Sequence, residues 1–409
     1  MKSGNINIKF CPPCEVSPIR ADGLKFDNPF ILASGPPTRN AEMILRGFAQ
    51  GWAGAVTKTI SLAPTRSPKP RLAVINNTRS LVNIELISSD SASQWIKWIK
   101  QIKKSAPDKI IIASIMASTR PADWQRLARM MADSGADALE LNISCPHGMP
   151  EKGMGSLIGQ DPKLAGLATK AVRKAVAIPV MVKLTPNVTD IKVIARACAD
   201  NGADALSGIN TVKSLPGVDI NTLAPLPDVR GQSTFGGYAG RGIKPIALRC
   251  IAEMYEETKL PISAGGGIFS WEDAVEFMLV GARTVQLCTA VMLAGYSIIH
   301  QLKHGLNNYL ISHKIKDIKD IVGASNKKLV KLSALKHQNP IAIISQKKCI
   351  LNLSGHCHRC FTVCKDGGFQ AISYNGKKCA VIKNLCDGCG LCIDICPNQA
   401  IKLNATPQP

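Results

Sequence analysis

The sequence predicts a closed (β/α)8 barrel of the TIM type, followed by a small ferredoxin-like domain at the C-terminus. Eight short apolar runs, separated by helical stretches, occupy the first 290 residues. Most of the runs are continuously apolar rather than alternating, which is typical of parallel strands covered on both faces. Nine of the 15 cysteines lie from Cys349 onward. A strand count near eight favours the closed barrel over a doubly wound sheet, which is the alternative.

The predicted strands and helices follow each other in regular order. The strands are FILAS (30–34), AVTKT (55–59), IIIASIM (110–116), ALELNIS (138–144), VMVKLT (180–185), ALSGIN (205–210), PISAGGGI (261–268) and TVQLCTA (284–290). The stretch PADWQRLARMMADSG is an amphipathic helix whose apolar stripe holds Trp124, Leu127, Ala128 and Met131. Two near copies, ADSGADALELN and ADNGADALSGIN, each indicate a helix end, a glycine stop and a strand. This corner is predicted at Gly51, Gly135, Gly202 and Gly281.

Composition changes divide the chain into three predicted parts. Residues 1–300 form the barrel, residues 301–344 a helical basic connector, and residues 345–409 the ferredoxin-like domain. The connector is either a solvated helical surface or a docking surface for a partner. Its lysines are Lys314, Lys316, Lys319, Lys327, Lys328, Lys331 and Lys336.

The 409-residue chain has a formal net charge of +21, from 50 basic and 29 acidic residues. Such a charge attracts nucleic acid, an acidic partner or anionic cofactors. Nucleic acid is not favoured, because aromatic residues do not interleave with the basic ones. We find neither a run of 18 apolar residues nor a secretory leader, so a cytoplasmic protein without a membrane span is expected. In that setting, the cysteines indicate metal or cluster binding rather than disulfides.

Polar residues that end the apolar runs are the candidate site residues, because barrels of this type carry their chemistry at the C-terminal ends of the strands. Lys58 and Lys183 are costly to bury unless an anionic group, such as a reduced flavin, meets them. The alternative is that they extend outward to solvent. The full set is Ser34, Lys58, Asn83, Asn142, Cys145, Lys183, Asn210 and Thr211.

Glycines after the seventh strand indicate a phosphate site. Gly265, Gly266 and Gly267 let backbone N–H groups approach a phosphate, and the loops after strands seven and eight bind phosphate in such barrels. No G-x-G-x-x-G follows any predicted strand, so a nicotinamide site of the Rossmann type is not predicted in this chain.

Cys145 begins a glycine-rich loop, NISCPHGMPEKGMGS, whose composition allows opening and closing over a ligand. An ordinary cysteine has a pKa of about 8.5 and can act as a general acid at neutral pH, and His147 could tune it. A purely structural role is favoured instead for Cys198 and Cys250. Amide side chains suit a planar ring with alternating N–H and C=O groups, so the asparagines and Thr211 indicate a pyrimidine-like diamide.

The tail contains CDGCGLCIDICP, an intact C-x2-C-x2-C-x3-C-P run that indicates a [4Fe–4S] cluster; a zinc site is the alternative. In two-cluster ferredoxins the fourth cysteine of each run ligates the other cluster. One predicted site therefore combines Cys386, Cys389 and Cys392 with Cys364, and the other combines Cys357, Cys360 and Cys396.

Ser354 stands at the remaining corner of the second site, where the spacing calls for cysteine. Four outcomes are open: a three-iron cluster, ligation by the serine oxygen, replacement by Cys349 or His356, or loss of that cluster.

These motifs resemble the dihydropyrimidine dehydrogenase family, most closely the flavin-containing subunit of the bacterial NAD-dependent enzyme. The resemblance runs from NPFILASGPPT through GAVTKT, NIELIS, IIASIM, ELNISCPHGM, KLTPNVTD, INTVKS, GYAGRGIKPIALR and GGGI into the tail. It implies an FMN cofactor. The matching FMN positions are Ser34, Lys58, Thr59, Lys183, Gly240, Gly265, Gly266, Gly267, Cys288 and Thr289.

The resemblance also implies the reaction. Uracil or thymine is reduced at its C5–C6 double bond, with a hydride from FMN N5 to C6 and a proton from Cys145 to C5. Electrons would arrive through the clusters from a partner flavoprotein subunit that oxidises NADH, within an oligomer. The matching pyrimidine positions are Asn83, Asn142, Ile143, Ser144, Asn210 and Thr211.

Two segments depart from the family pattern. SLAPTRSPKPRLAVINNTRSLV keeps only a trace of it, and Cys11 and Cys14 of the N-terminal CPPC have no family role, which favours a fortuitous pair. Three other functions are the alternatives: a dihydroorotate dehydrogenase-like enzyme, a tRNA uridine reductase supported only by the charge, and a non-catalytic electron-transfer subunit.

Overall fold

The computed structural model describes residues 8–9, 23–75, 77–146, 149, 151, 153–336 and 338–404. The N-terminal pair Cys11 and Cys14, and His147, the predicted neighbour of Cys145, lie outside the described residues. The chain divides into two compact units, residues 1–329 and 330–409.

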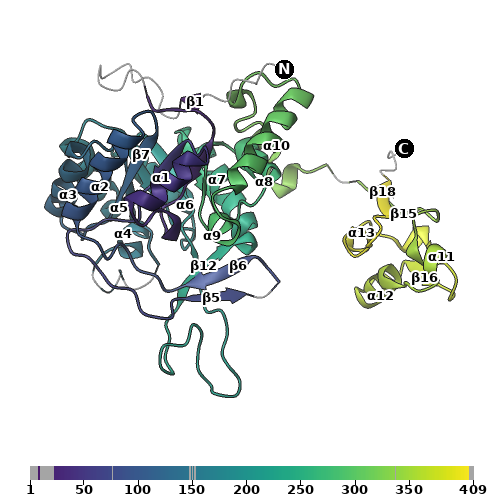
Figure 1. Cartoon of the computed structure of the whole chain (residues 1–409). Helices are drawn as coiled ribbons and strands as arrows, with labels where there is room; N and C mark the ends of the chain where they lie inside the picture. The colour runs from purple at the N-terminus through teal and green to yellow at the C-terminus, as the bar shows by residue number, and fades with distance from the viewer. Residues whose placement is uncertain are drawn as a thin grey trace. The chain divides into compact units, whose positions relative to one another are not determined.

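Eight parallel strands close into a barrel in the first unit, with the order β10-β13-β14-β3-β4-β7-β8-β9. Each contains part of one of the eight predicted runs, so the predicted barrel is confirmed. Figure 1 shows helices surrounding the strands. The strands are β3 (Phe30–Leu32), β4 (Gly54–Val56), β7 (Ile110–Ile115), β8 (Ala138–Asn142), β9 (Val180–Lys183), β10 (Ala205–Gly208), β13 (Ile262–Gly265) and β14 (Ala282–Leu287).

The helices bury their apolar stripes against the barrel. In α3 the buried residues are Trp124, Leu127, Ala128 and Met131, the stripe that the sequence predicts. The helices that alternate with the barrel strands are α1 (Ala41–Ala49), α2 (Ala92–Ser105), α3 (Pro121–Asp133), α5 (Pro162–Ala175), α6 (Ile191–Asp200), α7 (Lys244–Thr258) and α8 (Trp271–Leu279). A short helix, α4 (Ser156–Gly159), precedes α5.

The four predicted glycine corners follow α1, α3, α6 and α8. Gly51, Gly135, Gly202 and Gly281 all have positive φ, at 101°, 94°, 94° and 122°. Gly281 is also sterically required, because a Cβ there would meet Cγ of Tyr255 at 2.4 Å. A backbone that turns sharply from helix into strand therefore fixes glycine at these positions.

A four-stranded antiparallel sheet, which the sequence did not predict, lies beside the barrel (Figure 1). Its strands are β5 (Leu72–Ile75), β6 (Ser80–Asn83), β11 (Val212–Ser214) and β12 (Gly236–Gly240), in the order β11-β12-β6-β5. Asn83 of β6 pairs with Gly237 of β12, and its side-chain amide donates to the Gly237 carbonyl at 3.0 Å. This pairing joins segments 154 residues apart, which local sequence patterns do not reveal.

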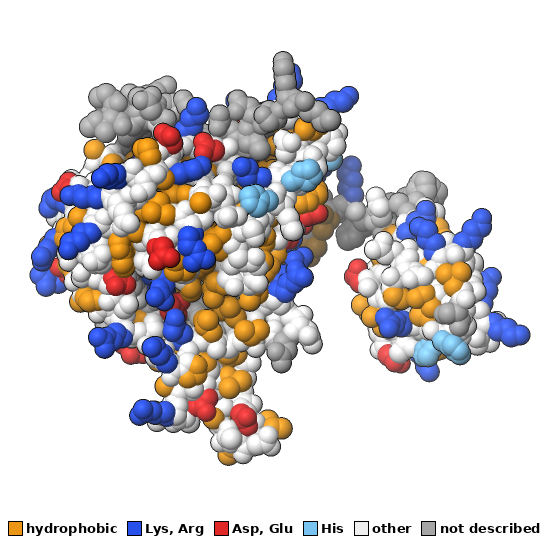
Figure 2. Space-filling model, viewed as in Figure 1, with side chains coloured by type: hydrophobic (Ala, Val, Ile, Leu, Met, Phe, Trp, Pro, Cys, Tyr) orange, Lys and Arg blue, Asp and Glu red, His pale blue; other side chains and the backbone are white. Residues whose placement is uncertain are grey.

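The segment after β14 packs back onto the barrel. Helices α9 (Thr289–Ala294) and α10 (Ile298–Ser312) follow, and Leu302, Leu306, Ile318 and Ile321 join the main core. The division between the units, after Leu329, therefore falls inside the segment predicted as a connector, residues 301–344. Its seven predicted lysines are exposed. Figure 2 shows Lys and Arg side chains scattered over the visible face of the first unit rather than gathered in one patch.

The second unit is a small α+β domain. Strands β15 (Ile341–Ile344) and β18 (Ile401–Asn404) pair antiparallel, as do β16 (Ile372–Tyr374) and β17 (Cys379–Val381). Its helices are α11 (Ile350–Ser354), α12 (Arg359–Asp366) and α13 (Leu391–Asp394). The small core contains aliphatic side chains and most of the tail cysteines. Within the described part of the whole chain, no helix is long and apolar enough to cross a membrane.

Candidate active site

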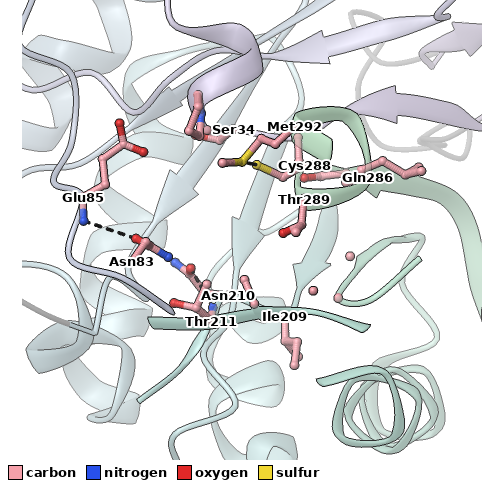
Figure 3. Close-up of a pocket in the computed structure, with 18 of the residues that line it drawn as sticks. Ser34, Asn83, Glu85, Ile209, Asn210, Thr211, Gln286, Cys288, Thr289 and Met292 are labelled. Atoms are coloured by element: carbon pink, nitrogen blue, oxygen red, sulfur yellow. Dashed lines mark hydrogen bonds between the residues drawn. The ribbon is translucent and has the colours of Figure 1, made fainter. Parts of the chain in front are cut away.

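One pocket gathers nearly all of the predicted site residues at the C-terminal ends of the barrel strands. All ten predicted FMN residues line it: Ser34, Lys58, Thr59, Lys183, Gly240, Gly265, Gly266, Gly267, Cys288 and Thr289. So do Cys145 and four of the six predicted pyrimidine residues, Asn83, Asn142, Asn210 and Thr211. Figure 3 shows Asn83, Asn210 and Thr211 gathered on one side, while Ser34, Cys288 and Thr289 lie across from them.

The remaining two predicted pyrimidine residues do not line the pocket. Ile143 belongs to the main hydrophobic core. Ser144 is fully buried, and its hydroxyl lies 2.9 Å from the Asn210 amide nitrogen and 3.1 Å from Asn142 Oδ1. Ser144 therefore positions two asparagines that do line the pocket.

The asparagine side chains are held in defined orientations. The Asn142 amide donates to Thr59 Oγ1 at 2.9 Å, and Asn210 Oδ1 accepts from the Thr211 backbone N–H at 2.8 Å. Asn83 Oδ1 accepts from the Glu85 backbone N–H at 3.3 Å. With these bonds fixing each amide, the remaining donors and acceptors present a set pattern to a ligand.

Both pocket lysines are paired with carboxylates of the chain itself. Lys58 Nζ lies 3.2 Å from Glu85 Oε2, and Glu85 Oε1 also meets Arg71 at 3.3 Å. Lys183 Nζ lies 3.7 Å from Glu140 Oε1 in the barrel interior. Glu85 and Glu140 therefore already offset part of the charge of these lysines, so their burial does not by itself require an anionic ligand.

A carboxamide at the pocket floor offers an acceptor. Gln286 Nε2 donates to Glu140 Oε2 and to Ser263 Oγ, both at 3.1 Å. Its Oε1 is buried and has no hydrogen-bond partner among the described residues, although Gln286 lines the pocket. A ligand N–H could satisfy this atom.

The glycine loop after β13 is closely packed. A Cβ on Gly267, whose φ is +81°, would meet Lys244 Cβ at 2.8 Å and the Gly240 carbonyl oxygen at 3.0 Å. Asp273 at the start of α8 accepts from the backbone N–H groups of Phe269 and Ser270 and pairs with Lys244. These contacts fix the conformation of the loop, whose glycines line the pocket without side chains and so allow a phosphate to approach the backbone.

Cys145 sits at the boundary between the pocket and an apolar cluster. It is 7% exposed and packs with Ile87, Met116 and Met149. Its carbonyl accepts from the Ser156 N–H at 2.9 Å, and a Cβ on Gly155 would meet the same carbonyl oxygen at 2.7 Å. The close approach of residue 155 thus fixes the backbone that carries the thiol.

Burial raises the pKa of the other three barrel cysteines. Cys198 and Cys250 lie in the main core, where burial raises their pKa to about 12 and about 11. Cys288 does line the pocket, and burial raises its pKa to about 11 despite the opposing charges of Lys58 and Lys183. Cys288 is therefore a neutral thiol near pH 7.

Sequence reasoning missed several pocket residues. Glu85 stood inside the quoted NIELIS motif and Gln286 inside a predicted strand, where a polar residue in an apolar run was an available signal. The apolar wall gave no signal, because its residues look like ordinary core. It includes Leu72, Leu81, Ile209, Ile243, Ile268 and Met292.

Two cavities in the second unit are lined by cysteines. Cys364, Cys386, Cys389 and Cys392 line the first, which is the combination that crossed ligation predicts. Cys357, Cys360 and Cys396 line the second together with Cys349 and Cys379. No group of three or more His, Cys, Asp or Glu side chains in the described part of the chain is arranged to hold a metal ion. The cysteines surround cavities instead, as ligands of a cluster of several atoms do.

The pocket at the C-terminal ends of the barrel strands and the two cysteine-lined cavities of the second unit are typical of one class of protein. This class is the flavin-dependent oxidoreductases with an iron–sulfur domain. The dihydroorotate dehydrogenase family model matches residues 19–310, and the 4Fe-4S dicluster domain model matches residues 342–403. The chain belongs to the family of dihydroorotate and dihydropyrimidine dehydrogenases.

Three relatives are similar to this chain over most of its length. The chain is 36% identical over 385 residues to the NAD-dependent dihydropyrimidine dehydrogenase subunit PreA of Escherichia coli K12, covering 92% of this chain and 89% of the relative. It is 36% identical over 340 residues to chloroplastic dihydropyrimidine dehydrogenase (NADP(+)) of Arabidopsis thaliana, covering 78% and 80%. The catalytic subunit of dihydroorotate dehydrogenase B (NAD(+)) of Pyrococcus abyssi is 37% identical over 305 residues, covering 75% and 97%.

A solved structure supports the fold. The crystal structure of dihydroorotate dehydrogenase from Eimeria tenella in complex with ferulenol superposes with a TM-score of 0.64 at 21% identity, covering 79% of this chain and 89% of that one.

Proposed function

We propose that this chain reduces the C5–C6 double bond of uracil or thymine, giving the 5,6-dihydropyrimidine. The observation that carries the proposal is the pocket itself, which is lined by Asn83, Asn142 and Asn210 together with Cys145 and the glycine loop. The match to the E. coli subunit, which extends over 92% of this chain, supports the same activity.

The residues present fit FMN. Backbone groups of the loop at Gly265–Gly267 and the hydroxyl of Thr289 would hold its phosphate, while Lys58, Lys183 and Gln286 would face its ring system. The buried Oε1 of Gln286 supplies an acceptor for a ring N–H. Bound FMN would supply the hydride that C6 of the pyrimidine receives.

The chain's own residues would orient the pyrimidine and supply the proton. A uracil ring alternates N–H and C=O groups, and amides are the side chains that meet both kinds of group. Cys145 would donate its thiol proton to C5. A double bond conjugated to a carbonyl needs this proton as well as the hydride, and the Cys145 thiol is an acid that lines the pocket.

Glu85 favours a neutral pyrimidine over orotate, the carboxylated alternative. The ionisable residues that line the pocket are Lys58, Lys183, Glu85 and two cysteines. Glu85 pairs with Lys58 and Glu140 pairs with Lys183, so the charge of each lysine is already partly offset and attracts the carboxylate of orotate less strongly. Dihydroorotate oxidation remains the second candidate, since a relative at 37% identity carries that name.

The tail would deliver the electrons. We propose that a partner flavoprotein subunit oxidises NADH and passes electrons to the clusters, with the exposed lysines around Lys327 as part of its docking surface. The E. coli relative is itself named as a subunit, which supports a multi-subunit assembly.

The test reduces the purified full chain with dithionite under argon and then adds uracil, thymine or orotate. Rapid reoxidation of the flavin by uracil or thymine, with the dihydropyrimidine found by chromatography, is the expected result. Preferential reoxidation by orotate would overturn the substrate assignment. In a second arm, NADH and uracil are mixed with the chain alone, and fast turnover there would overturn the need for a partner.

A further inference from the structure

The second cysteine cavity has more thiols than its predicted three. Cys349 and Cys379 line it together with Cys357, Cys360 and Cys396. The intact cavity, by comparison, is lined by four cysteines, the number that one [4Fe–4S] cluster needs. Either Cys349 or Cys379 could therefore be the fourth ligand beside Cys357, Cys360 and Cys396.

We infer that Cys349 is the fourth ligand of the second [4Fe–4S] cluster, so that the chain has two complete cluster sites. This inference rests on the part of the proposed function that assigns clusters to the tail. In this assignment Cys349, and not Ser354, occupies the fourth ligand position of the second cluster.

The length of the loop after Cys349 explains why the spacing rule pointed to Ser354. Seven residues separate Cys349 from Cys357, whereas two separate Cys386 from Cys389, a difference of five. Helix α11, Ile350–Ser354, is five residues long. The additional residues thus form one short helix, of which Ser354 is the last residue.

Helix α11 is compact enough for the residues on either side of it, Cys349 and Cys357, to line the same cavity. Five helical residues advance only about 7.5 Å, less than half the length of an extended segment. Gly355 closes the helix with φ +78°, and its N–H donates to the Leu351 carbonyl at 3.0 Å. Leu351, 3% exposed, anchors the helix in the small core. Cys349 and Cys357 can therefore line one cavity despite the longer loop.

The two cavities are built alike around these cysteines. Ala342 of β15 and Leu403 of β18 line the intact cavity, and Ile344 and Ile401 of the same strands line the second. The fourth cysteine of each run also has the same kind of support. Cys364 Sγ accepts from the Ala371 N–H at 3.3 Å, and Cys396 Sγ accepts from the Ala400 N–H at 3.2 Å.

The position of Cys379 suits a wall residue rather than a ligand. It lies on β17, is 1% exposed, and its thiol is hydrogen-bonded to Cys360. In the intact cavity, the paired strand β16 contributes Ile372, an apolar wall residue. Cys349 instead follows the turn at 345–348 and opens its run, as Cys386 opens the intact one. A buried cysteine on a strand commonly acts as a small apolar residue.

His356, the other proposed replacement, is exposed and lines a surface hollow with His358, Thr362 and Tyr374. Cys357 lines both this hollow and the second cavity, but His356 does not line the second cavity. Of the described residues on the second cavity, Cys349 is therefore the one that fits the first position of the run.

The experiment measures iron, acid-labile sulfide and EPR spectra of the full chain, purified anaerobically. The unmodified chain should hold about eight irons, four for each [4Fe–4S] cluster. Cys349→Ala should lower this to seven with a three-iron EPR signal, or to four, and Cys357→Ala should give a matching loss. Cys379→Ala is the matched control and should keep all eight. Eight irons in Cys349→Ala, or a loss in Cys379→Ala, would overturn the assignment.

A second measurement does not depend on the variant folding. The unmodified chain is treated with iodoacetamide before and after removal of the clusters, and labelled cysteines are identified by mass spectrometry. Cys349 is partly exposed, so it should be labelled only after cluster removal. Equal labelling in both states would count against ligation. These readouts need no pyrimidine: eight irons without uracil reduction would refute the proposed function and leave this assignment standing, whereas four irons in the unmodified chain would refute the assignment.

Discussion

At the scale of single residues, Glu140 in the barrel interior offsets the charge of Lys183 at the pocket wall. Glu140 is fully buried and accepts hydrogen bonds from Ser207 and Gln286 while facing Lys183. A buried carboxylate of this kind is stable only because these partners surround it. Lys183 is thereby held at the pocket wall by Glu140. The sequence shows Glu140 as a charged residue in an apolar strand, but only the folded barrel shows that Lys183 is its partner.

At Cys145 we predict a catalytic defect without loss of flavin. Cys145→Ser replaces the thiol with a hydroxyl that is a far weaker acid, so the rate of flavin reoxidation by uracil should fall by about 10²- to 10⁴-fold. The measurement is a single-turnover reaction of the dithionite-reduced chain. Cys198→Ala, in the core away from the pocket, is the control and should keep the rate. An unchanged rate in Cys145→Ser would show that Cys145 is not the proton donor.

At the scale of elements, the loop between β13 and α8 forms the proposed phosphate site. Its backbone is fixed by steric contact at Gly267 and by Asp273, which forms a capping box with Ser270 at the start of α8. A loop shaped before ligand binding loses less entropy when the cofactor binds. Substitutions here should therefore affect flavin retention more than the chemistry.

Gly267→Ala should release most of the flavin. The new Cβ would lie within 3.0 Å of Lys244 and Gly240 atoms at a positive φ, so the loop must shift. Gly231→Ala is the matched control: its φ is also about 80°, but no atom lies within 4 Å of a Cβ there. Flavin absorbance per chain measures the outcome. Equal flavin loss in both variants would show that backbone strain, rather than packing of the loop, is responsible.

Asp273→Asn should alter the pH dependence of stability. Burial alone would raise the pKa of Asp273, but its hydrogen bonds to Lys244 and Phe269 hold the pKa below its usual value. A lowered pKa means that the stabilisation is complete above the unfolded value of about 3.9 and is lost as the pH falls through the lower folded value. The variant should lose about 2 kcal/mol at pH 7.

Denaturant unfolding of both proteins between pH 7 and pH 3 measures this effect. The difference in free energy of unfolding should be constant from pH 7 to about pH 5 and should shrink below about pH 4. A difference that stays constant down to pH 3 would contradict the role of the Asp273 charge.

At the scale of the whole molecule, the chain consists of a flavin-site unit and a cluster-site unit that each have their own core. The barrel unit extends to Leu329, because α10 and Ile318 pack against it. All residues that line the candidate active-site pocket belong to that unit. Chemistry at the pyrimidine and electron supply should therefore be separable.

A chain ending at Leu329 should fold, retain flavin and be reoxidised by uracil at close to the full-chain rate after dithionite reduction. It should not accept electrons from NADH and the partner subunit, because it lacks the cluster cysteines. Stopped-flow absorbance at the flavin band measures both half-reactions. Partner-driven reduction of the shortened chain at the full-chain rate would contradict an electron route through the tail.

The sequence by itself determined the barrel, its glycine corners, the mouth residues and the intact cluster run. These features leave local signals, since apolar periodicity, helix stops and ligand spacing repeat over a few residues. The tertiary structure decided what depends on distant segments: the pairing of Asn83 with Gly237, the partners of Lys58 and Lys183, and the apolar wall of the pocket. It also brought Cys349 into the second cysteine cavity. A fixed spacing rule cannot anticipate a helix inserted between two proposed ligands. Only the folded backbone shows that Cys349 and Cys357, on either side of α11, line the same cavity.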